Sequence, residues 1–130
     1  MAKYRNRSFD NEHGHWDSSL EYYRYLVLLE AEKKGIISNI RRQVDYILIP
    51  EQYELRLVMR KTKKGMIQEN KMCQVEKPCA YRADFVYTKY GYDVIEDTKG
   101  YRTRDYIIKR KLMRFQGHPI REVKSPNEPV

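Results

Sequence analysis

Three charged residues near the end of a predicted β-hairpin, Asp84, Asp97 and Lys99, could do chemistry together. The stretch YRADFVY is typical of a strand, and GYDVIED follows it across a turn at Tyr90-Gly91. In a hairpin loop of even length centred on that turn, Asp84 lies opposite Asp97, with their Cβ atoms roughly 4.5–5.5 Å apart. Lys99 lies two residues beyond Asp97 and therefore projects to the same face. The pattern predicts a cluster of two carboxylates and one ammonium group.

Two opposed carboxylates destabilise a hairpin unless a positive charge lies between them. A divalent cation is one candidate, because Mg²⁺ binds carboxylate oxygens and keeps several water ligands. Lys99 alone is the competing candidate, which would make the cluster a structural ion pair. A loop of odd length would instead place Glu96 opposite Asp84. In the even register Glu96 points to the other face, where we expect it to be solvated or ion-paired.

Composition narrows the class of partner. The 130 residues are enough for one domain, and 26 Lys and Arg against 18 Asp and Glu give a net charge of +8. This surplus favours nucleic acid as partner over an anionic membrane surface, although a charge of about 2–8 also serves solubility alone. The longest apolar run, Leu26 to Leu29, is too short to cross a bilayer. We expect a cytoplasmic protein with two free cysteines, Cys73 and Cys79, and no membrane association.

The first predicted helix is SSLEYYRYLVLLEAEKKG, with Ser18 as N-cap and an apolar stripe at Tyr22, Tyr25, Leu26 and Leu29. A buried strand is predicted at 44–50. The alternating stretch 51–60 predicts a half-buried strand paired with it, while 66–78 fits either a strand or a loop.

A second helix is predicted in TRDYIIKRKLMRF, capped by Thr103 and ended near Gly117, and IREV predicts a last short strand. The order of elements indicates an α/β fold, a mixed α+β sheet with helices packed on it. We divide the chain into a basic N-terminal arm at 1–16, a single domain at 17–124 and a disordered tail at 125–130.

These residues carry a resemblance. Asp84, a hairpin and then Asp97-Thr98-Lys99 resemble the core signature of the PD-(D/E)XK nuclease superfamily, although Ala83 stands where that signature has proline. More narrowly, WDSSLEYYRYLVLLEAEKKGII, RRQVDYILIP, YRADFVY, IEDTKG and IIKRKLMRF resemble, in this order, a family of small phage and prophage proteins of that superfamily. The resemblance implies a restriction-endonuclease-like core of helix, three antiparallel strands, helix and strand.

The resemblance also implies roles for residues. Asp84 and Asp97 would bind Mg²⁺ or Mn²⁺, with Glu21 of the first helix completing the site, and Lys99 would orient water or stabilise charge on the phosphate. Glu21 has an alternative role as the helix cap, because Ser18 to Glu21 forms a capping box. Gln43 and Glu96 are possible outer residues of the site.

A basic cluster follows the predicted site directly. Its residues, together with those of the N-terminal arm, are expected to bind DNA phosphates: Arg102, Arg104, Lys109, Arg110, Lys111, Arg114, Lys3, Arg5 and Arg7. We found no pattern for base-specific reading, so selection by DNA shape is expected.

The sequence thus predicts a metal-dependent endodeoxyribonuclease of the type that resolves Holliday junctions or acts in phage recombination. A resolver would need to be a homodimer, because it cuts two strands symmetrically. The alternatives are a non-catalytic DNA-binding protein or a phage accessory protein that retains the nuclease fold.

Overall fold

The computed structural model of the chain describes residues 7–99 and 101–130. Within this range the fold is a mixed α/β arrangement of eight strands and two helices, in which strand residues predominate. The elements are β1 (Phe9–Asn11), β2 (Gly14–Trp16), α1 (Ser19–Lys33), β3 (Ser38–Ile49), β4 (Gln52–Thr62), β5 (Gly65–Glu76), β6 (Cys79–Lys89), β7 (Tyr92–Thr98), α2 (Arg104–Phe115) and β8 (Ile120–Val123). The mixed α/β class predicted from the sequence is confirmed.

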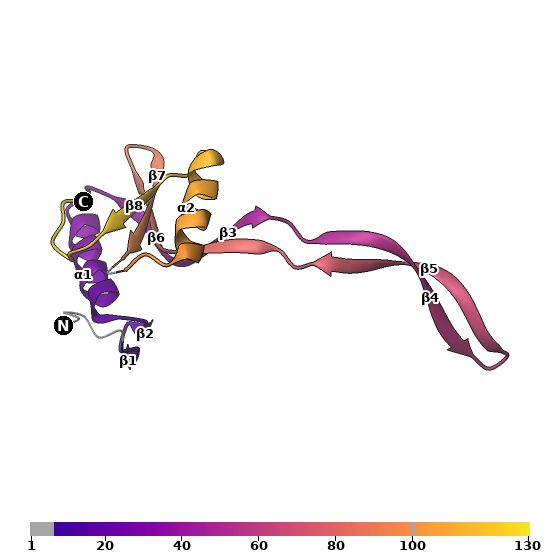
Figure 1. Cartoon of the computed structure of the whole chain (residues 1–130). Helices are drawn as coiled ribbons and strands as arrows, with labels where there is room; N and C mark the ends of the chain where they lie inside the picture. The colour runs from indigo at the N-terminus through magenta and orange to yellow at the C-terminus, as the bar shows by residue number, and fades with distance from the viewer. Residues whose placement is uncertain (1–6, 100) are drawn as a thin grey trace. The chain divides into compact units, whose positions relative to one another are not determined.

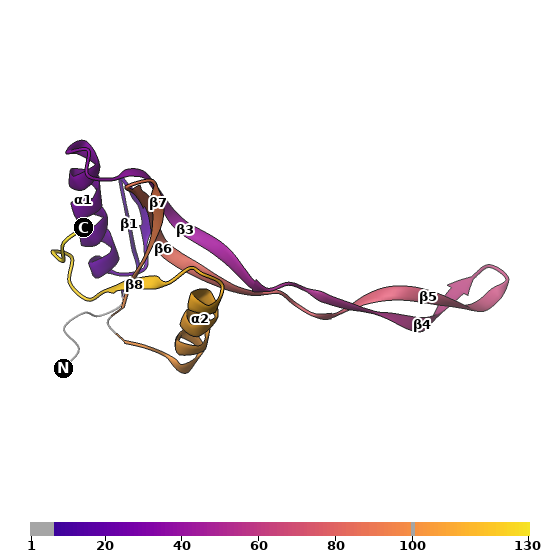
Figure 2. The same cartoon turned by 90° about the horizontal axis from the view of Figure 1, so that it is seen from above.

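The chain forms two compact units rather than one domain. Of the described residues, the first unit contains 7–46, 81–99 and 101–130, and the second contains 47–80. The main sheet has the strand order β3-β6-β7-β8, in which β6 and β7 are antiparallel and β7 and β8 are parallel. Helices α1 and α2 lie on opposite sides of the β6 and β7 strands (Figures 1 and 2).

Helix α1 begins as predicted, because the Ser18 side chain accepts a hydrogen bond from the Glu21 backbone N–H at 3.2 Å. Its buried face differs from the predicted stripe. The buried side chains are Leu20, Glu21, Arg24, Leu28 and Ala31. Two of these buried residues, Glu21 and Arg24, are charged. The spacing of apolar residues in the sequence therefore does not predict which face of the helix is buried. The predicted stripe instead flanks the core, with Leu26 exposed.

An aromatic core forms between α1 and the sheet. Trp16, Phe85 and Tyr87 are fully buried and pack with Leu28 and Ile37. Trp16 ends the small hairpin of β1 and β2, so residues 9–16 belong to the folded unit rather than to an arm. Lys3 and Arg5, predicted to contact DNA from that arm, lie outside the described residues.

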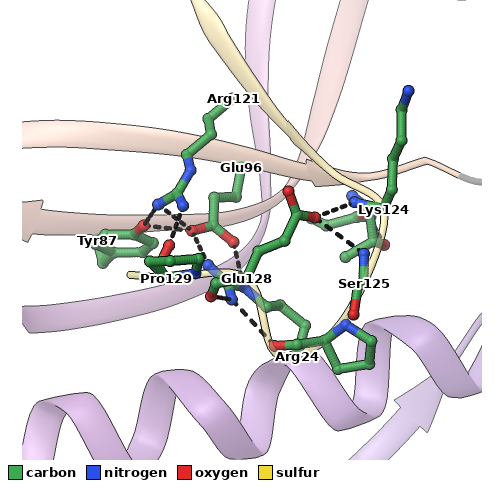
Figure 3. Close-up of polar contacts among 11 residues, drawn as sticks. Arg24, Tyr87, Glu96, Arg121, Lys124, Ser125, Glu128 and Pro129 are labelled. Atoms are coloured by element: carbon green, nitrogen blue, oxygen red, sulfur yellow. Dashed lines mark hydrogen bonds and ion pairs between the residues drawn. The ribbon is translucent and has the colours of Figure 1, made fainter.

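A buried ion pair joins α1 to β7 (Figure 3). The Arg24 guanidinium donates to both oxygens of Glu96, Nε to Oε1 and Nη2 to Oε2, each at 2.8 Å. Both side chains are 0% exposed. The Tyr87 hydroxyl also donates to Glu96, and the Arg121 guanidinium lies 3.6 Å from it. These contacts satisfy a carboxylate that could not remain buried alone.

The C-terminal segment packs against the same pair. We expected residues 125–130 to be disordered, whereas Arg24 Nη1 donates to the backbone carbonyls of Pro126, at 3.1 Å, and Glu128. Lys89 Nζ donates to the Val130 carbonyl at 2.7 Å, and Val130 contacts the aromatic core. The partners of the tail, Arg24 and Lys89, are distant in the chain, so no local pattern in the tail indicates these contacts.

In the second unit, β4 pairs with β5 in an antiparallel hairpin, closed at Thr62 and Gly65 (Figure 1). The predicted pairing of β4 with the preceding strand is therefore wrong, and the undecided stretch is strand β5. The apolar side of β4 was predicted to be buried, but Leu55 and Leu57 are each 63% exposed.

Helix α2 and strand β8 form where the sequence predicts them. The Thr103 side chain caps the helix by accepting from the Tyr106 backbone N–H at 3.1 Å, and Gly117, with φ of +87°, follows its end. Among the described residues, no helix is both long and apolar enough to cross a membrane.

Removal of one partner of the buried ion pair should be costly. We expect Arg24→Met to lower the free energy of unfolding by about 3–5 kcal/mol, because it leaves the Glu96 carboxylate buried without its main partner. Denaturant unfolding measures this change. The matched control is Arg41→Met, which removes a 3.0 Å ion pair with Asp93 between partly exposed side chains and should cost less than about 1 kcal/mol. Equal losses in the two variants would contradict this account of α1 docking.

Candidate functional site

The register of the β6–β7 hairpin brings two carboxylates together. Phe85 pairs with Glu96 and Lys89 with Tyr92, which is the even register in which Asp84 and Asp97 would be the next opposed residues. Asp84 lies near enough for its charge to raise the pKa of the Asp97 carboxyl group. Asp97 is 2% exposed. A one-residue slip would have replaced Asp97 with Glu96 at this position.

Each carboxylate is held by neighbours on the strands. Asp84 Oδ2 accepts hydrogen bonds from the Thr98 backbone N–H at 2.8 Å and from the Thr98 hydroxyl at 2.7 Å. Asp97 Oδ2 accepts from the Tyr81 hydroxyl. Burial and the charge of Asp97 raise the pKa of Tyr81, so its hydroxyl remains a donor at neutral pH. The two carboxylates therefore have fixed positions.

Lys99 supplies the cation of the cluster. Its Nζ lies 3.3 Å from Asp97 Oδ1 and 4.3 Å from the centre of the Tyr106 ring of α2. The ammonium is thus held between a carboxylate and an aromatic face, an arrangement that restricts its motion. Its side chain remains 27% exposed, so it can also reach a bound anion.

Glu21 joins the cluster from the first turn of α1. Its Oε2 accepts from the Asp17 backbone N–H at 3.3 Å, and its Oε1 accepts from the Gln43 side-chain amide at 2.8 Å. The negative charge of Asp84 also helps to raise the pKa of the Glu21 carboxyl group. The two oxygens of Glu21 therefore have different partners, one at the helix start and one on β3. Glu21 can therefore bond the backbone just before the N-cap while its other oxygen bonds Gln43.

The backbone at Gln43 is strained. Its φ is +53°, which is uncommon for a residue with a Cβ. The amide of this residue nevertheless reaches Glu21, and the neighbouring Arg42 guanidinium lies 3.6 Å from the same carboxylate. Left-handed residues in the middle of a strand often occur where a side chain must be re-aimed.

Electrostatics leave the carboxylates incompletely neutralised. Burial and the charge of Asp84 raise the pKa of Asp97 from its ordinary 3.8 to about 7, although Tyr81 and Lys99 oppose the shift. Burial and Asp84 also raise the pKa of Glu21 to about 6. At Asp97, desolvation and the like charge of Asp84 outweigh the Lys99 ammonium, so this carboxyl group would gain from a further cation.

The donor set fits Mg²⁺ or Mn²⁺ in one respect. Over residues 7–99 and 101–130, no group of three or more His, Cys, Asp or Glu side chains is arranged to hold a metal ion. However, Mg²⁺ is usually bound by one or two carboxylates, and water and substrate phosphate complete its coordination. Asp84 and Asp97 are such a pair. They could hold the ion, with Glu21 beside them.

Glu96 is not part of this cluster. It lies on the other face, bound to Arg24, as the even register required.

The sequence reasoning missed the contributions of Tyr81, Thr98 and Tyr106. Strict alternation places Tyr81 on the face opposite Asp84, so only the observed backbone reveals its contact with Asp97.

The basic residues of α2 are divided between ion pairs and solvent. Arg102 binds Glu122 of β8 through two contacts at 2.7 and 2.5 Å, and Arg110 lies 3.7 Å from the same carboxylate. Arg110, Lys111 and Arg114 line a cavity of about 310 Å³ beside β8. Among the described residues, Lys109, Lys111, Arg114, Arg104 and Arg7 form no ion pair. These cations are available for an anion.

The comparison with protein families gives one match. The family described as "Protein of unknown function (DUF1064)" matches residues 1–126, and the chain belongs to it. No curated protein and no solved structure matches the chain.

The raised pKa of Asp97 makes stability depend on pH. The folded chain retains the Asp97 proton up to about pH 7, whereas the unfolded chain loses it near 3.8, so stability falls as pH rises between these values. Asp97→Asn removes this effect. Without metal, its gain in unfolding free energy over the wild type should be small near pH 4, grow towards pH 7 and level off at about 4 kcal/mol.

Melting temperatures across this pH range measure the effect. Asp93→Asn is the control, because Asp93 lies on the same hairpin but is exposed and paired with Arg41. A melting-temperature difference for Asp97→Asn that does not increase with pH would contradict the repulsion between the two carboxylates.

Proposed function

We propose that this protein is a metal-dependent endodeoxyribonuclease that hydrolyses DNA phosphodiester bonds. The observation that carries the proposal is the pairing of buried Asp97 with Asp84, with the Lys99 ammonium 3.3 Å from Asp97. The resemblance of Asp84, Asp97-Thr98-Lys99 and the order α1, β3, β6, β7, α2, β8 to the PD-(D/E)XK core supports the same assignment.

Asp84 and Asp97 would hold Mg²⁺ or Mn²⁺, which when bound polarises a phosphate and lowers the pKa of a water ligand. Lys99 would donate hydrogen bonds to the phosphate oxygens, where negative charge develops. Tyr81 and Thr98 would keep the carboxylates in place. Glu21, with its partner Gln43, would accept a hydrogen bond from water in the site.

The surface of α2 supports DNA as the substrate. Lys109, Lys111 and Arg114 form no ion pair among the described residues and can contact phosphates. Phosphate contacts position a duplex but carry no sequence information. We therefore propose that the enzyme selects branched DNA, such as a four-way junction, by shape. This substrate class would suit a role in phage recombination or DNA processing.

A cleavage assay tests the proposal. Linear, nicked and four-way DNA of matched sequence are incubated with Mg²⁺, Mn²⁺ or EDTA. We expect cleavage only with metal and fastest on the four-way junction. Asp97→Asn and Lys99→Met should each reduce the rate by about 100-fold or more while DNA binding persists, because each removes a group that acts on the reacting phosphate or its metal. Asp93→Asn should retain full activity.

DNA binding without cleavage of any substrate would contradict the nuclease proposal. It would favour the alternative of a non-catalytic DNA-binding protein that retains the fold. Absence of both binding and cleavage would contradict both and favour a phage accessory protein.

A further inference from the structure

The β4–β5 hairpin has two faces of different character. In an antiparallel pair, opposed residues project to the same side. One face combines Tyr53, Leu55, Leu57 and Met59 of β4 with their partners Gln74, Met72, Asn70 and Gln68 of β5. None of these eight side chains is charged. The hairpin's other face contains Glu54, Arg56, Arg60, Glu69 and Lys71. We refer to the first as the uncharged face.

The uncharged face is open to solvent in the single chain. Its five large apolar side chains, Tyr53, Leu55, Leu57, Met59 and Met72, are each between 52% and 63% exposed. A contiguous apolar surface of this kind is unusual on a monomeric protein and marks an interaction site. A two-stranded hairpin is also only marginally stable in water unless something covers its apolar side.

Charge decides which partner fits. DNA would be contacted through Lys and Arg, and the uncharged face has none from Tyr53 to Met59. The whole chain carries a net charge of +8, so a second copy is repelled wherever charged surfaces meet. It can approach closely on a face without charge. Such a face is also complementary to itself, as an interface with two-fold symmetry requires.

We propose that the uncharged face is a homodimer interface, on which the hairpin of a second copy of this chain packs face to face. The apolar side chains of the two hairpins interdigitate as in a β-sandwich. Apolar and polar residues alternate in YELRLVM, as is typical of a strand with one buried face. In the proposed dimer the apolar face of this strand would be buried. The inference depends on the hairpin alone and not on the proposed nuclease activity.

Sedimentation velocity of the full chain, freed of nucleic acid and held at high salt, tests the interface. We expect the wild type to be a dimer at micromolar concentration. Leu57→Lys places a charge at the centre of the face in both copies and should raise the dimer Kd by about 100-fold or more. Asn70→Lys, which lies opposite Leu57 and removes no apolar group, should act in the same direction.

Val58→Lys is the matched control. Val58 is the neighbour of Leu57 on the other face, opposite Glu69, so a lysine there meets an acidic partner and should leave the dimer intact. If Leu57→Lys fails to fold by circular dichroism, Asn70→Lys decides. A monomeric wild type, a dimer that survives Asn70→Lys, or equal weakening by Val58→Lys would each overturn the proposal.

Discussion

The antiparallel ladder between β6 and β7 is the constraint on which the rest of the molecule depends. Because neighbouring residues of a strand point to opposite faces, the side chains of Glu96 and Asp97 lie on opposite sides of the sheet. Glu96 enters the core and binds Arg24 of α1, with both side chains fully buried. This contact holds the register, since a slip of one residue would leave Arg24 and Glu96 apart and without partners. The same register leaves Asp84 and Asp97 next to its last pair, Phe85 and Glu96.

The two carboxylates, Asp84 and Asp97, disfavour each other's charge in the folded chain. Two groups favour charge on Asp97, the Tyr81 hydroxyl and the Lys99 ammonium, yet burial and Asp84 outweigh them. The residual repulsion is consistent with a site that a divalent cation completes. Glu96, by contrast, shows how the same chain satisfies a buried carboxylate with protein groups alone.

Local patterns predicted the parts of the fold that local contacts determine. The turn at Tyr90-Gly91, the Thr103 cap of α2 and the register that pairs Phe85 with Glu96 follow from short stretches of sequence. Features that depend on long-range contacts were not predicted. Arg24 is charged but lies on the buried face of α1, which interrupts the apolar pattern expected of such a face. Its burial could not be predicted locally, because its partner Glu96 is distant in the chain.

Other features of the structure depend on geometry that alternation alone misrepresents. Strand β4 has the pattern of a half-buried strand, but its apolar side chains are exposed in the single chain. The left-handed backbone at Gln43 and the contact of Tyr81 with Asp97 depart from ideal strand geometry, so their part in the candidate site could not be predicted.

The central claim is that Asp84 and Asp97 form a divalent cation site, and calorimetric titration of the DNA-free protein with Mn²⁺ tests it most directly. The account predicts saturable binding to the wild type and to Asp93→Asn, and loss of that binding in Asp84→Asn and in Asp97→Asn. Failure of the folded wild type to bind Mn²⁺, or binding that survives both substitutions, would contradict it.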